Sequence, residues 1–212
     1  VIQTAGDISN FFSNIWPISF FSFEDLRLFF SLVLIAISCI IMGAGIPTTA
    51  TYIILVAVAA PALAQLGIEP LVAHFFVFYY GVLADITPPV ALAAYAASGI
   101  AKSNPFKTGN TAFRLGIAKA LVPFVFVYSP SLLLITGEFQ TNQLIITMIG
   151  TLIGIALIGI AFSGYWFRTL RKYEQIIIGI GSLFFVAPGI KSMVFGLLII
   201  LPMLFLQFLK KN

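Results

Sequence analysis

Long apolar segments separated by short polar ones make up most of the chain. Residues 1–25 differ, because aromatic side chains are mixed there with acids and asparagines, which is typical of a segment at a membrane interface or of the remnant of an earlier helix. From residue 28 to 66 the chain is almost wholly apolar except at 43–49, where Gly-Ala-Gly-Ile-Pro-Thr-Thr interrupts it. A single helix over 28–66 would be about 58 Å long, whereas a bilayer core is about 30 Å thick. The segment is therefore either one broken helix or two separate passes, and we favour a helix broken at 43–49.

Two shorter apolar segments follow, at 71–83 and 91–101. As helices they would span about 20 Å and about 16 Å, too short for either to cross a bilayer alone. Asp85-Ile86-Thr87-Pro88-Pro89 lies between them. Adjacent prolines end a helix, because proline lacks an N–H and disfavours helical backbone in the residue before it. The pattern predicts a re-entrant helical hairpin over 71–101 with residues 85–89 at its tip.

The rest of the pattern predicts transmembrane helices joined by short loops. A basic amphipathic connector at 102–119 precedes expected spans at 120–136, 144–162 and 193–208 and a shorter apolar segment at 176–187. The sequence thus predicts an all-α membrane protein with multi-pass helices, one re-entrant hairpin and one broken helix. Its expected parts are an interfacial segment 1–25, a transport-domain half 26–137 and C-terminal transmembrane helices 138–212.

Composition and charge strengthen this prediction and add an orientation. Hydrophobic residues make up 60% of the chain, charged residues only 8%, and the mean hydropathy is +1.10, so the exterior must face lipid. The net charge of +4 comes from short basic loops, which form no patch suited to nucleic acid. The positive-inside rule places loops 102–119, 168–172 and 210–211 in the cytoplasm and 137–143 outside, with the hairpin entering from the cytoplasmic face and Lys191 as an exception.

The two predicted breaks carry the candidate chemistry. Pro47 removes the helical donor for the carbonyl of Gly43, and Pro88 and Pro89 do so for Ala84 and Asp85. Backbone and hydroxyl oxygens around a small cavity suit a hard monovalent cation, and the starts of half-helices present N–H groups to an anion. The alternative is that 43–49 is only a proline kink and 85–89 only a loop. The candidate Na⁺-binding residues are Gly43, Gly45, Thr48, Thr49, Ala84, Asp85 and Thr87, with Thr51 beside them.

Other polar side chains are better explained by packing or by solvation. His74 has no partner at metal-ligand spacing in the sequence, so we expect it to be a hydrogen-bonded packing residue. Tyr79, Tyr80 and Tyr95 either line a polar path or lie at the membrane interface. Cys39 is the single cysteine and excludes an internal disulfide. We expect three acids, Glu69, Glu138 and Glu174, to be solvated in loops.

Two motifs resemble a known family of membrane transporters. They are GAGIPTTATY at 43–52 and HFFVFYYGVLADITPPVALA at 74–93. They resemble the large membrane subunit of tripartite ATP-independent periplasmic (TRAP) transporters, in the TAXI branch with fused membrane subunits. The resemblance implies an elevator-type permease in the cell inner membrane that imports small organic acids. A Na⁺ gradient would drive it, with no other cofactor, and an extracytoplasmic solute-binding protein would supply the substrate.

Carried over to these residues, the resemblance makes 43–49 an unwound helix and 85–89 a hairpin tip beside the substrate. The implied substrate-binding residues are Thr49, Tyr52, Thr87, Pro88, Pro89 and Tyr95. The family's usual Gly-Met-Gly is Gly43-Ala44-Gly45 here, which keeps both glycines. The motifs correspond to a C-terminal half, and the chain begins at Val1 without an initiator methionine. We therefore expect a partner, either the N-terminal half or another membrane subunit, besides the lipid bilayer.

Three other functions compete with the permease. One is a non-transporting scaffold or degenerate fragment of such a permease. Another is an intramembrane enzyme, which would need Asp85 and His74 within hydrogen-bond reach, whereas a transporter needs the 43–49 break to face residues 85–89. No nucleophile–base pair or phosphate loop is visible in the sequence, so we expect no enzyme. A channel is disfavoured because no ring of charges or repeated filter is visible.

Overall fold

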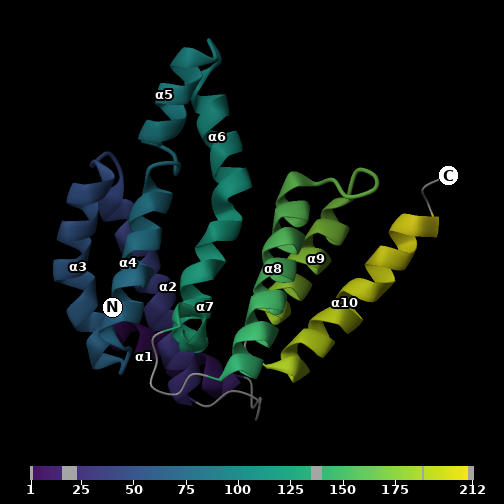
Figure 1. The fold of residues 1–212 in the computed structure, drawn as a ribbon, viewed down its shortest axis with the longest axis horizontal. Helices are drawn as coiled ribbons and strands as arrows, with labels where there is room; N and C mark the ends of the chain where they lie inside the picture. Colours follow the sequence, from purple (N-terminus) through teal and green to yellow (C-terminus); the bar gives the residue numbers. More distant parts are fainter. Residues whose placement is uncertain (1, 16–22, 135–139, 188, 210–212) are drawn as a thin grey trace.

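The structure, a computed structural model, describes residues 2–15, 23–134, 140–187 and 189–209, and its regular elements there are helices. The α-helices are α1 (Ile2–Ile15), α2 (Phe23–Gly43), α3 (Thr48–Gln65), α4 (Pro70–Ala84), α5 (Leu92–Ile100), α6 (Pro105–Gly116), α7 (Val122–Tyr128), α8 (Thr141–Ser163), α9 (Lys172–Val186) and α10 (Ile190–Leu209). Two 3₁₀ helices, η1 (Ile117–Leu121) and η2 (Pro130–Leu133), flank α7. The predicted all-α class is confirmed (Figure 1).

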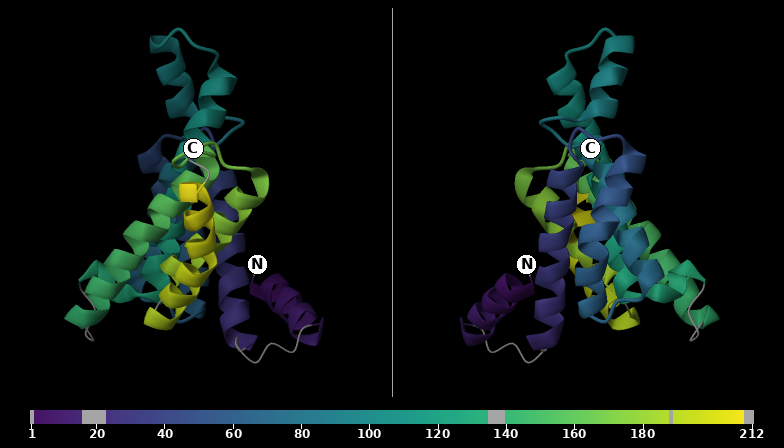
Figure 2. Two further views of the ribbon diagram at one scale, coloured as in Figure 1. Left: turned by 90° about the vertical axis from the view of Figure 1, so that its right-hand side faces the viewer. Right: turned by 90° about the vertical axis from the view of Figure 1, so that its left-hand side faces the viewer.

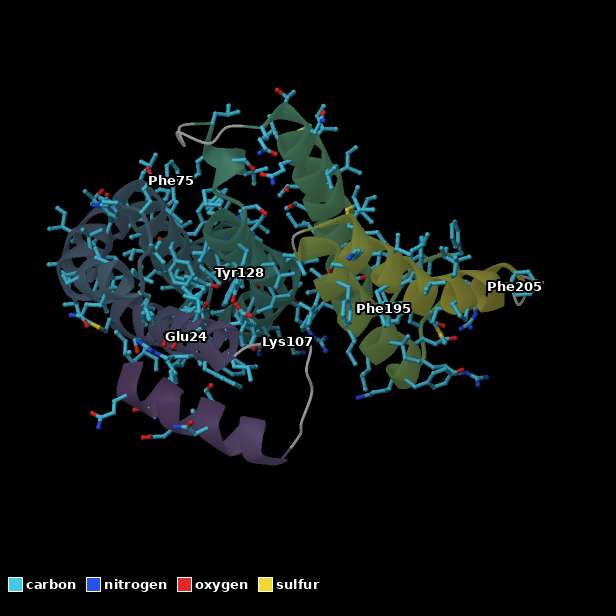
Figure 3. The ribbon with its side chains drawn as sticks, turned by 90° about the horizontal axis from the view of Figure 1, so that it is seen from below. Glu24, Phe75, Lys107, Tyr128, Phe195 and Phe205 are labelled. Atoms are coloured by element: carbon cyan, nitrogen blue, oxygen red, sulfur yellow. The ribbon has the colours of Figure 1, made fainter. Side chains whose placement is uncertain are left out.

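The helices have the length and the surface of membrane-spanning segments. Within the described residues, four stretches are long and apolar enough to cross a bilayer: Glu24–Gly43, Thr48–Gln65, Pro105–Tyr128 and Thr141–Ser163. Large apolar side chains lie on the outside of the bundle. Phe195 and Phe205 of α10, for example, are 61% and 64% exposed, and Phe205 lies at the end of α10 farthest from the other helices (Figure 3). A bundle with this exterior needs lipid around it, so the chain is a multi-pass membrane protein.

Helices α2 and α3 lie side by side and run in opposite directions (Figures 1 and 2). The chain reverses at 44–47, where Ile46 N–H donates to the Gly43 carbonyl at 3.3 Å and Gly45 has a positive φ of 85°. Leu32 of α2 and Leu55 of α3 are buried in one apolar core together with Phe76 of α4. This corrects the predicted broken helix over 28–66: the segment forms two separate passes, because the glycine allows a full reversal and the two apolar faces then cover each other.

Helices α4 and α5 do not form the predicted re-entrant hairpin. Figure 1 shows α5 beyond the end of α4, continuing away from the bundle, with α6 returning beside it. The close contact that fixes α5 is with α6, because a Cβ at Gly109 would lie 2.8 Å from the Tyr95 ring. The prediction over 71–101 is therefore corrected: residues 85–91 interrupt one helical path, and the hairpin is made by α5 and α6.

The basic connector at 102–119 is helical rather than a loop. Asn104 caps α6 by accepting a hydrogen bond from Lys107 N–H at 3.0 Å. The helical path then continues through η1 into α7, so that Pro105–Tyr128 is one candidate span. Tyr80 of α4 holds this path by donating to the Ala120 carbonyl at 2.6 Å. The expected span at 120–136 thus begins earlier in the chain, and its helix α7 ends at Tyr128.

Helix α1 packs against α2 (Figures 2 and 3) and buries Ala5 and Ser9. The first part of the predicted interfacial segment 1–25 is therefore helical. Residues 16–22 lie outside the described part of the chain, and the interfacial position of the segment stays a prediction.

Helices α8, α9 and α10 form a second bundle with its own core. Leu157, Ile178 and Ile200, one from each helix, are buried together. The helices approach closely where glycines face their neighbours: a Cβ on Gly150 would lie 2.6 Å from the Phe185 carbonyl oxygen, and one on Gly154 would lie 2.6 Å from Val186 Cγ2. Small residues at such crossings let helix backbones approach, as is common in membranes.

The basic and acidic segments lie at different ends of the bundle, and the predicted orientation in the membrane stays a prediction. The turn after α5 and the loop between α8 and α9, both basic, lie toward one end of the molecule in Figure 1, and the start of α2, whose first turn contains Glu24 and Asp25, lies toward the other. Helix α4 begins at this acidic end, so the structure does not support entry of a hairpin from the cytoplasmic face. Residues 137–139 of the predicted outer loop and residues 210–211 lie outside the described residues, and residues 141–143 belong to α8.

Candidate functional site

The structure brings the two breaks together where α3 begins and α4 ends. Thr48 Oγ1 donates a hydrogen bond to Asp85 Oδ2 at 2.8 Å. A Cβ on Gly43 would lie 3.0 Å from the Ala84 Cβ, and a Cβ on Gly45 would lie 3.2 Å from Val90 Cγ1. The 43–49 break therefore faces residues 85–90 along its length, which is the arrangement that the transporter hypothesis requires.

The first break is built by a proline start and by small residues. Pro47 precedes α3, and its carbonyl accepts from Thr51 N–H at 2.9 Å, while the Thr51 hydroxyl donates to the Ile46 carbonyl at 3.0 Å. Thr51 is buried at the point where Gly43 of α2 and Gly81 of α4 approach it. A larger side chain at either glycine would push the three helices apart, so the glycines set the distance between the breaks.

The second break is a series of short turns. Thr87 donates from its hydroxyl to the Leu83 carbonyl at 2.7 Å, which continues the last turn of α4. Pro88 and Pro89 then prevent a further helical turn. Ala91 takes a left-handed conformation with φ of 38° just before α5, which is uncommon for a residue with a side chain. The path of α4 therefore stops with Asp85 bonded to the start of α3 and the Thr87 hydroxyl bonded back to α4.

The carbonyls that lose their helical donors at the breaks have other donors. Gly43 accepts from Ile46 N–H at 3.3 Å, Ala84 from Thr87 N–H at 3.1 Å, and Asp85 from Ala93 N–H at 3.1 Å. The first two donors belong to tight turns, and the third is the second residue of α5. Each carbonyl oxygen has a second lone pair, so coordination of an ion is still chemically open to it.

The side-chain oxygens at the breaks are those of one carboxylate and several hydroxyls. Asp85, Thr48 and Thr87 are half-buried, whereas Thr49 is exposed at the start of α3. A carboxylate beside a hydroxyl offers the hard oxygen ligands that alkali and alkaline-earth ions prefer. No three His, Cys, Asp or Glu side chains come together as a metal-binding group in the described parts of the chain.

Tyr52 and His74 form a separate pair between α3 and α4. The Tyr52 hydroxyl and His74 Nδ1 are 2.7 Å apart and hydrogen-bonded. His74 is thus the hydrogen-bonded packing residue that we predicted, and the hydroxyl of Tyr52, a predicted substrate ligand, is engaged by it. His74 and Asp85 lie roughly 16 Å apart along α4 at 1.5 Å per residue, so the pair that an intramembrane enzyme would need is not formed.

The remaining tyrosines have separate places. Tyr95 donates to the Pro89 carbonyl at 2.7 Å, which ties α5 back to the second break. Tyr80 is buried, and Tyr79 packs edge-on against Phe126 with ring centroids 5.4 Å apart. Tyr79 and Tyr80 therefore belong to the packing of the bundle, and Tyr95 alone of the three lies next to the breaks.

Glu174 was predicted to be a solvated loop residue, and the structure corrects this. It is 1% exposed in the first turn of α9 and pairs with Arg168 at 2.6 Å. Burial by itself raises the pKa of Glu174, but hydrogen bonds from Arg168 and from Arg171 N–H outweigh it and lower that pKa below its ordinary value of 4.5. The overlooked signal was an acid at the third position of a helix, where it caps the first turn. Glu69 is exposed as predicted, and Glu138 lies outside the described residues.

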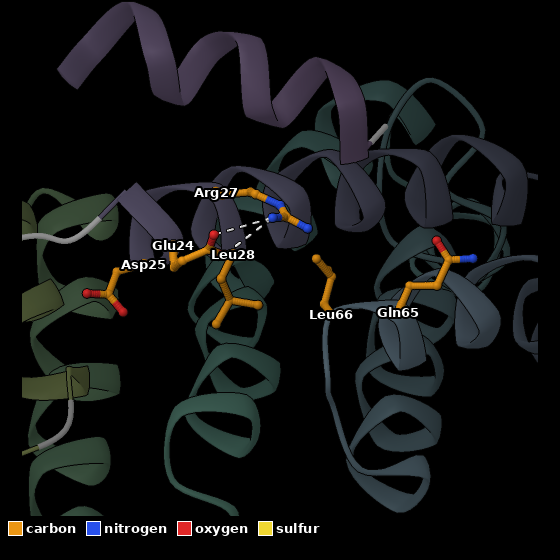
Figure 4. A pocket seen from close by; sticks show the side chains of 6 residues that line it. All are labelled: Glu24, Asp25, Arg27, Leu28, Gln65 and Leu66. Carbon is orange, nitrogen blue, oxygen red and sulfur yellow. Dashed lines mark hydrogen bonds and ion pairs between the residues drawn. The ribbon is translucent and has the colours of Figure 1, made fainter. Parts of the chain in front are cut away.

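A pocket of about 240 Å³ lies between the start of α2 and the end of α3 (Figure 4). Its polar wall includes the ion pair of Arg27 with Glu24 at 3.3 Å. Because it lies at the opposite ends of α2 and α3 from the two breaks, it is separate from the candidate site. It is lined by Glu24, Asp25, Arg27, Leu28, Gln65 and Leu66.

Comparison with known families identifies the part of the chain that contains both breaks. Residues 19–141, more than half of the chain, match the family model "Tripartite ATP-independent periplasmic transporter, DctM component". The chain belongs to the DctM family. This is a family of transporter components rather than of enzymes, so the protein is a membrane component of a TRAP transporter. No curated protein and no solved structure matches the chain.

The DctM match includes the Thr48–Asp85 contact and ends at the first residue of α8. The α8–α10 bundle lies beyond the matched segment, and the candidate site lies within it.

Proposed function

We propose that the chain is the permease component of a Na⁺-coupled secondary transporter that imports small organic acids. It would work in the cell inner membrane and receive its substrate from an extracytoplasmic solute-binding protein. Its other expected partner is the N-terminal half of a TAXI-type permease or a separate membrane subunit, with this chain supplying the C-terminal half. Membership of the DctM family supports the transport role, and the geometry of the two breaks supports the cation site.

The hydrogen bond between Thr48 and Asp85 is the observation that carries this proposal. It joins two helix interruptions that are far apart in the sequence and places a carboxylate at both of them. An ionisable side chain among membrane helices is costly to keep, and such residues generally serve an ion or substrate pathway. Na⁺ between the two side chains would have its charge neutralised by Asp85. The Asp85 carboxylate would then contact Na⁺ instead of accepting the hydrogen bond of the Thr48 hydroxyl.

The substrate would lie on the exposed side of the same breaks. Thr49 is exposed at the first turn of α3, where N–H groups without helical acceptors favour an anion. Pro89 is also exposed, and Tyr95 is anchored to its carbonyl. A carboxylate at the start of α3 would then be close to the proposed Na⁺, which would couple the binding of the two because each lowers the electrostatic cost of the other.

Uptake by the complete transport system in proteoliposomes tests this proposal. Thr48→Val removes the hydroxyl ligand and Asp85→Asn removes the charge, and Thr111→Val is the matched control because its hydroxyl bonds only within α6. We expect the Na⁺ concentration for half-maximal uptake to rise about fivefold in Thr48→Val, by the ~1 kcal/mol of one polar contact. Asp85→Asn should lower the response to Na⁺ further, and Thr111→Val should match the wild type.

Three results would count against the proposal. Uptake independent of Na⁺ would remove cation coupling, and wild-type behaviour of Asp85→Asn would remove the site. Absence of uptake with every organic acid offered, in a system whose binding protein is shown to be loaded, would favour a non-transporting scaffold.

A further inference from the structure

The loop between α8 and α9 combines exposed aromatic and basic side chains. Together with the first two residues of α9 it forms residues 164–173, called the 164–173 loop below, with the sequence Gly-Tyr-Trp-Phe-Arg-Thr-Leu-Arg-Lys-Tyr, and it lies beyond the family match. Tyr165 is 58% exposed and Tyr173 is 46% exposed. Arg171 and Lys172 are exposed as well. Exposed aromatic and cationic side chains concentrated in ten residues suit a partner that binds both kinds of group.

The loop has a fixed conformation. Leu170 N–H donates to the Gly164 carbonyl at 2.7 Å and closes the loop at its base, and Tyr165 and Thr169 form a β-bridge across it. Gln175 of α9 donates to the Leu170 carbonyl at 3.1 Å. The exposed side chains are thus presented from an ordered backbone, which lowers the entropy cost of binding.

The three cations of the loop have different tasks. Arg168 is committed to the buried Glu174 by two hydrogen bonds, of 2.6 and 3.2 Å. Arg171 contributes its backbone N–H to the same carboxylate at 2.8 Å, while its side chain is exposed. The internal ion pair therefore orders the loop, and the side chains of Arg171 and Lys172 extend from it toward the surroundings.

Apolar side chains next to the loop place it at the level of lipid headgroups. Phe162 in the last turn of α8 is 45% exposed, and Ile176 in the second turn of α9 is 62% exposed. Helix α8 is itself a candidate span. Here exposed apolar side chains lie within about a turn of exposed cations and tyrosines. The same order, apolar first and then aromatic and cationic, is found where a membrane helix passes from the acyl chains into the headgroups.

We propose that the 164–173 loop binds the headgroup of an anionic phospholipid. Arg171 and Lys172 would contact the phosphate, and the rings of Tyr165 and Tyr173 would lie at the glycerol level. Charge complementarity and the position of the loop favour a lipid over a soluble anion. A zwitterionic lipid offers the same phosphate without net charge, so preference for the anionic headgroup is the property to measure.

Trp166 supplies a reporter inside the loop. The chain has two tryptophans, so Trp16→Phe leaves Trp166 as the single tryptophan, whose fluorescence can be excited selectively. The full chain is reconstituted in phosphatidylcholine bilayers, and quenching of Trp166 by brominated phosphatidylglycerol is compared with quenching by brominated phosphatidylcholine at equal mole fractions. We expect stronger quenching by the anionic lipid, with the preference weakened by 0.5 M salt.

Removing the cations should remove this preference. Arg171→Gln and Lys172→Gln should each weaken it about fivefold, because a basic residue near an anionic surface contributes ~1 kcal/mol. The charge-conserving variant Arg171→Lys with Lys172→Arg should keep it. Lys191→Gln, which removes an exposed cation at the start of α10, is the matched control and should behave as the wild type.

Several outcomes would overturn the proposal. Equal quenching of the wild type by the two lipids would show that there is no headgroup preference. An equal loss in Lys191→Gln would show a general effect of net charge rather than a site. Loss of the preference in the presence of millimolar glycerol phosphate would assign the site to a soluble phosphate compound. The lipid site would be supported if the glutamine variants lose the preference for the anionic lipid and the charge-conserving variant keeps it.

Discussion

The crossing of α8 and α9 gives a sharp test of the second bundle, through the substitution Gly150→Ala. An added Cβ would lie 2.6 Å from the backbone carbonyl oxygen of Phe185 and 3.2 Å from the Met193 sulfur. A methionine side chain can move aside, but a backbone carbonyl in a helix cannot without moving the helix. The matched control is Gly159→Ala on the same helix, because nothing lies within 4 Å of a Cβ there.

The expected difference follows from two terms. Replacing glycine by alanine in a helix favours folding by up to about 1 kcal/mol at both positions, so this gain cancels in the comparison. Overpacking a tight crossing costs about 1–3 kcal/mol, and only Gly150→Ala meets it. We therefore expect Gly150→Ala to have a free energy of unfolding about 1–3 kcal/mol below that of Gly159→Ala.

Unfolding by SDS in mixed micelles measures this difference. Trp166 packs against the core of α8–α10, so its fluorescence, in a Trp16→Phe background, reports on this bundle. Gly150→Ala should unfold at a lower SDS mole fraction than Gly159→Ala. Equal midpoints, with a difference below about 0.5 kcal/mol, would refute the close crossing of the two helices.

Two further predictions concern an ion pair and a turn. Glu174→Gln leaves Arg168 without its carboxylate and should destabilise the second bundle by about 2 kcal/mol, less than the 3–5 of a fully buried pair because Arg168 is partly exposed. Because the pKa of Glu174 is lowered on folding, its contribution to the free energy of unfolding is present above about pH 4.5 and is lost as the pH falls through the pKa of the folded state. The SDS midpoints of the wild type and Glu174→Gln should therefore converge as the pH is lowered. Midpoints that stay equally far apart would contradict the coupling. Gly45→Ala and Gly67→Ala both meet a positive φ and should each cost about 1 kcal/mol, but only Gly45 also faces Val90. Uptake assays should therefore show a raised Na⁺ requirement in Gly45→Ala alone, and an equal change in Gly67→Ala would show that strain rather than the contact between breaks is responsible.

The sequence predicted those features of the fold that depend on single residues or on short segments. Apolar segments of bilayer length predicted helices, and prolines and glycines predicted both interruptions to within a few residues. The motifs that contain these interruptions also indicated the transporter family. The transporter hypothesis required the two breaks to face each other, and the structure has this arrangement, because polar groups at helix ends inside an apolar bundle need partners.

The direction of the chain after each break was decided only by tertiary packing. A proline or glycine ends a helix without specifying whether the next helix turns back or continues. Antiparallel packing of α2 with α3 buries both apolar faces, whereas α5 packs against α6 rather than against α4. For Glu174 the local pattern indicates a cap for the first turn of α9, but its burial depends on Arg168, which the fold of the α8–α9 loop brings onto it. Local sequence thus determined where helices begin and end, and the long-range contacts, whose partners no local pattern names, determined which of them lie side by side.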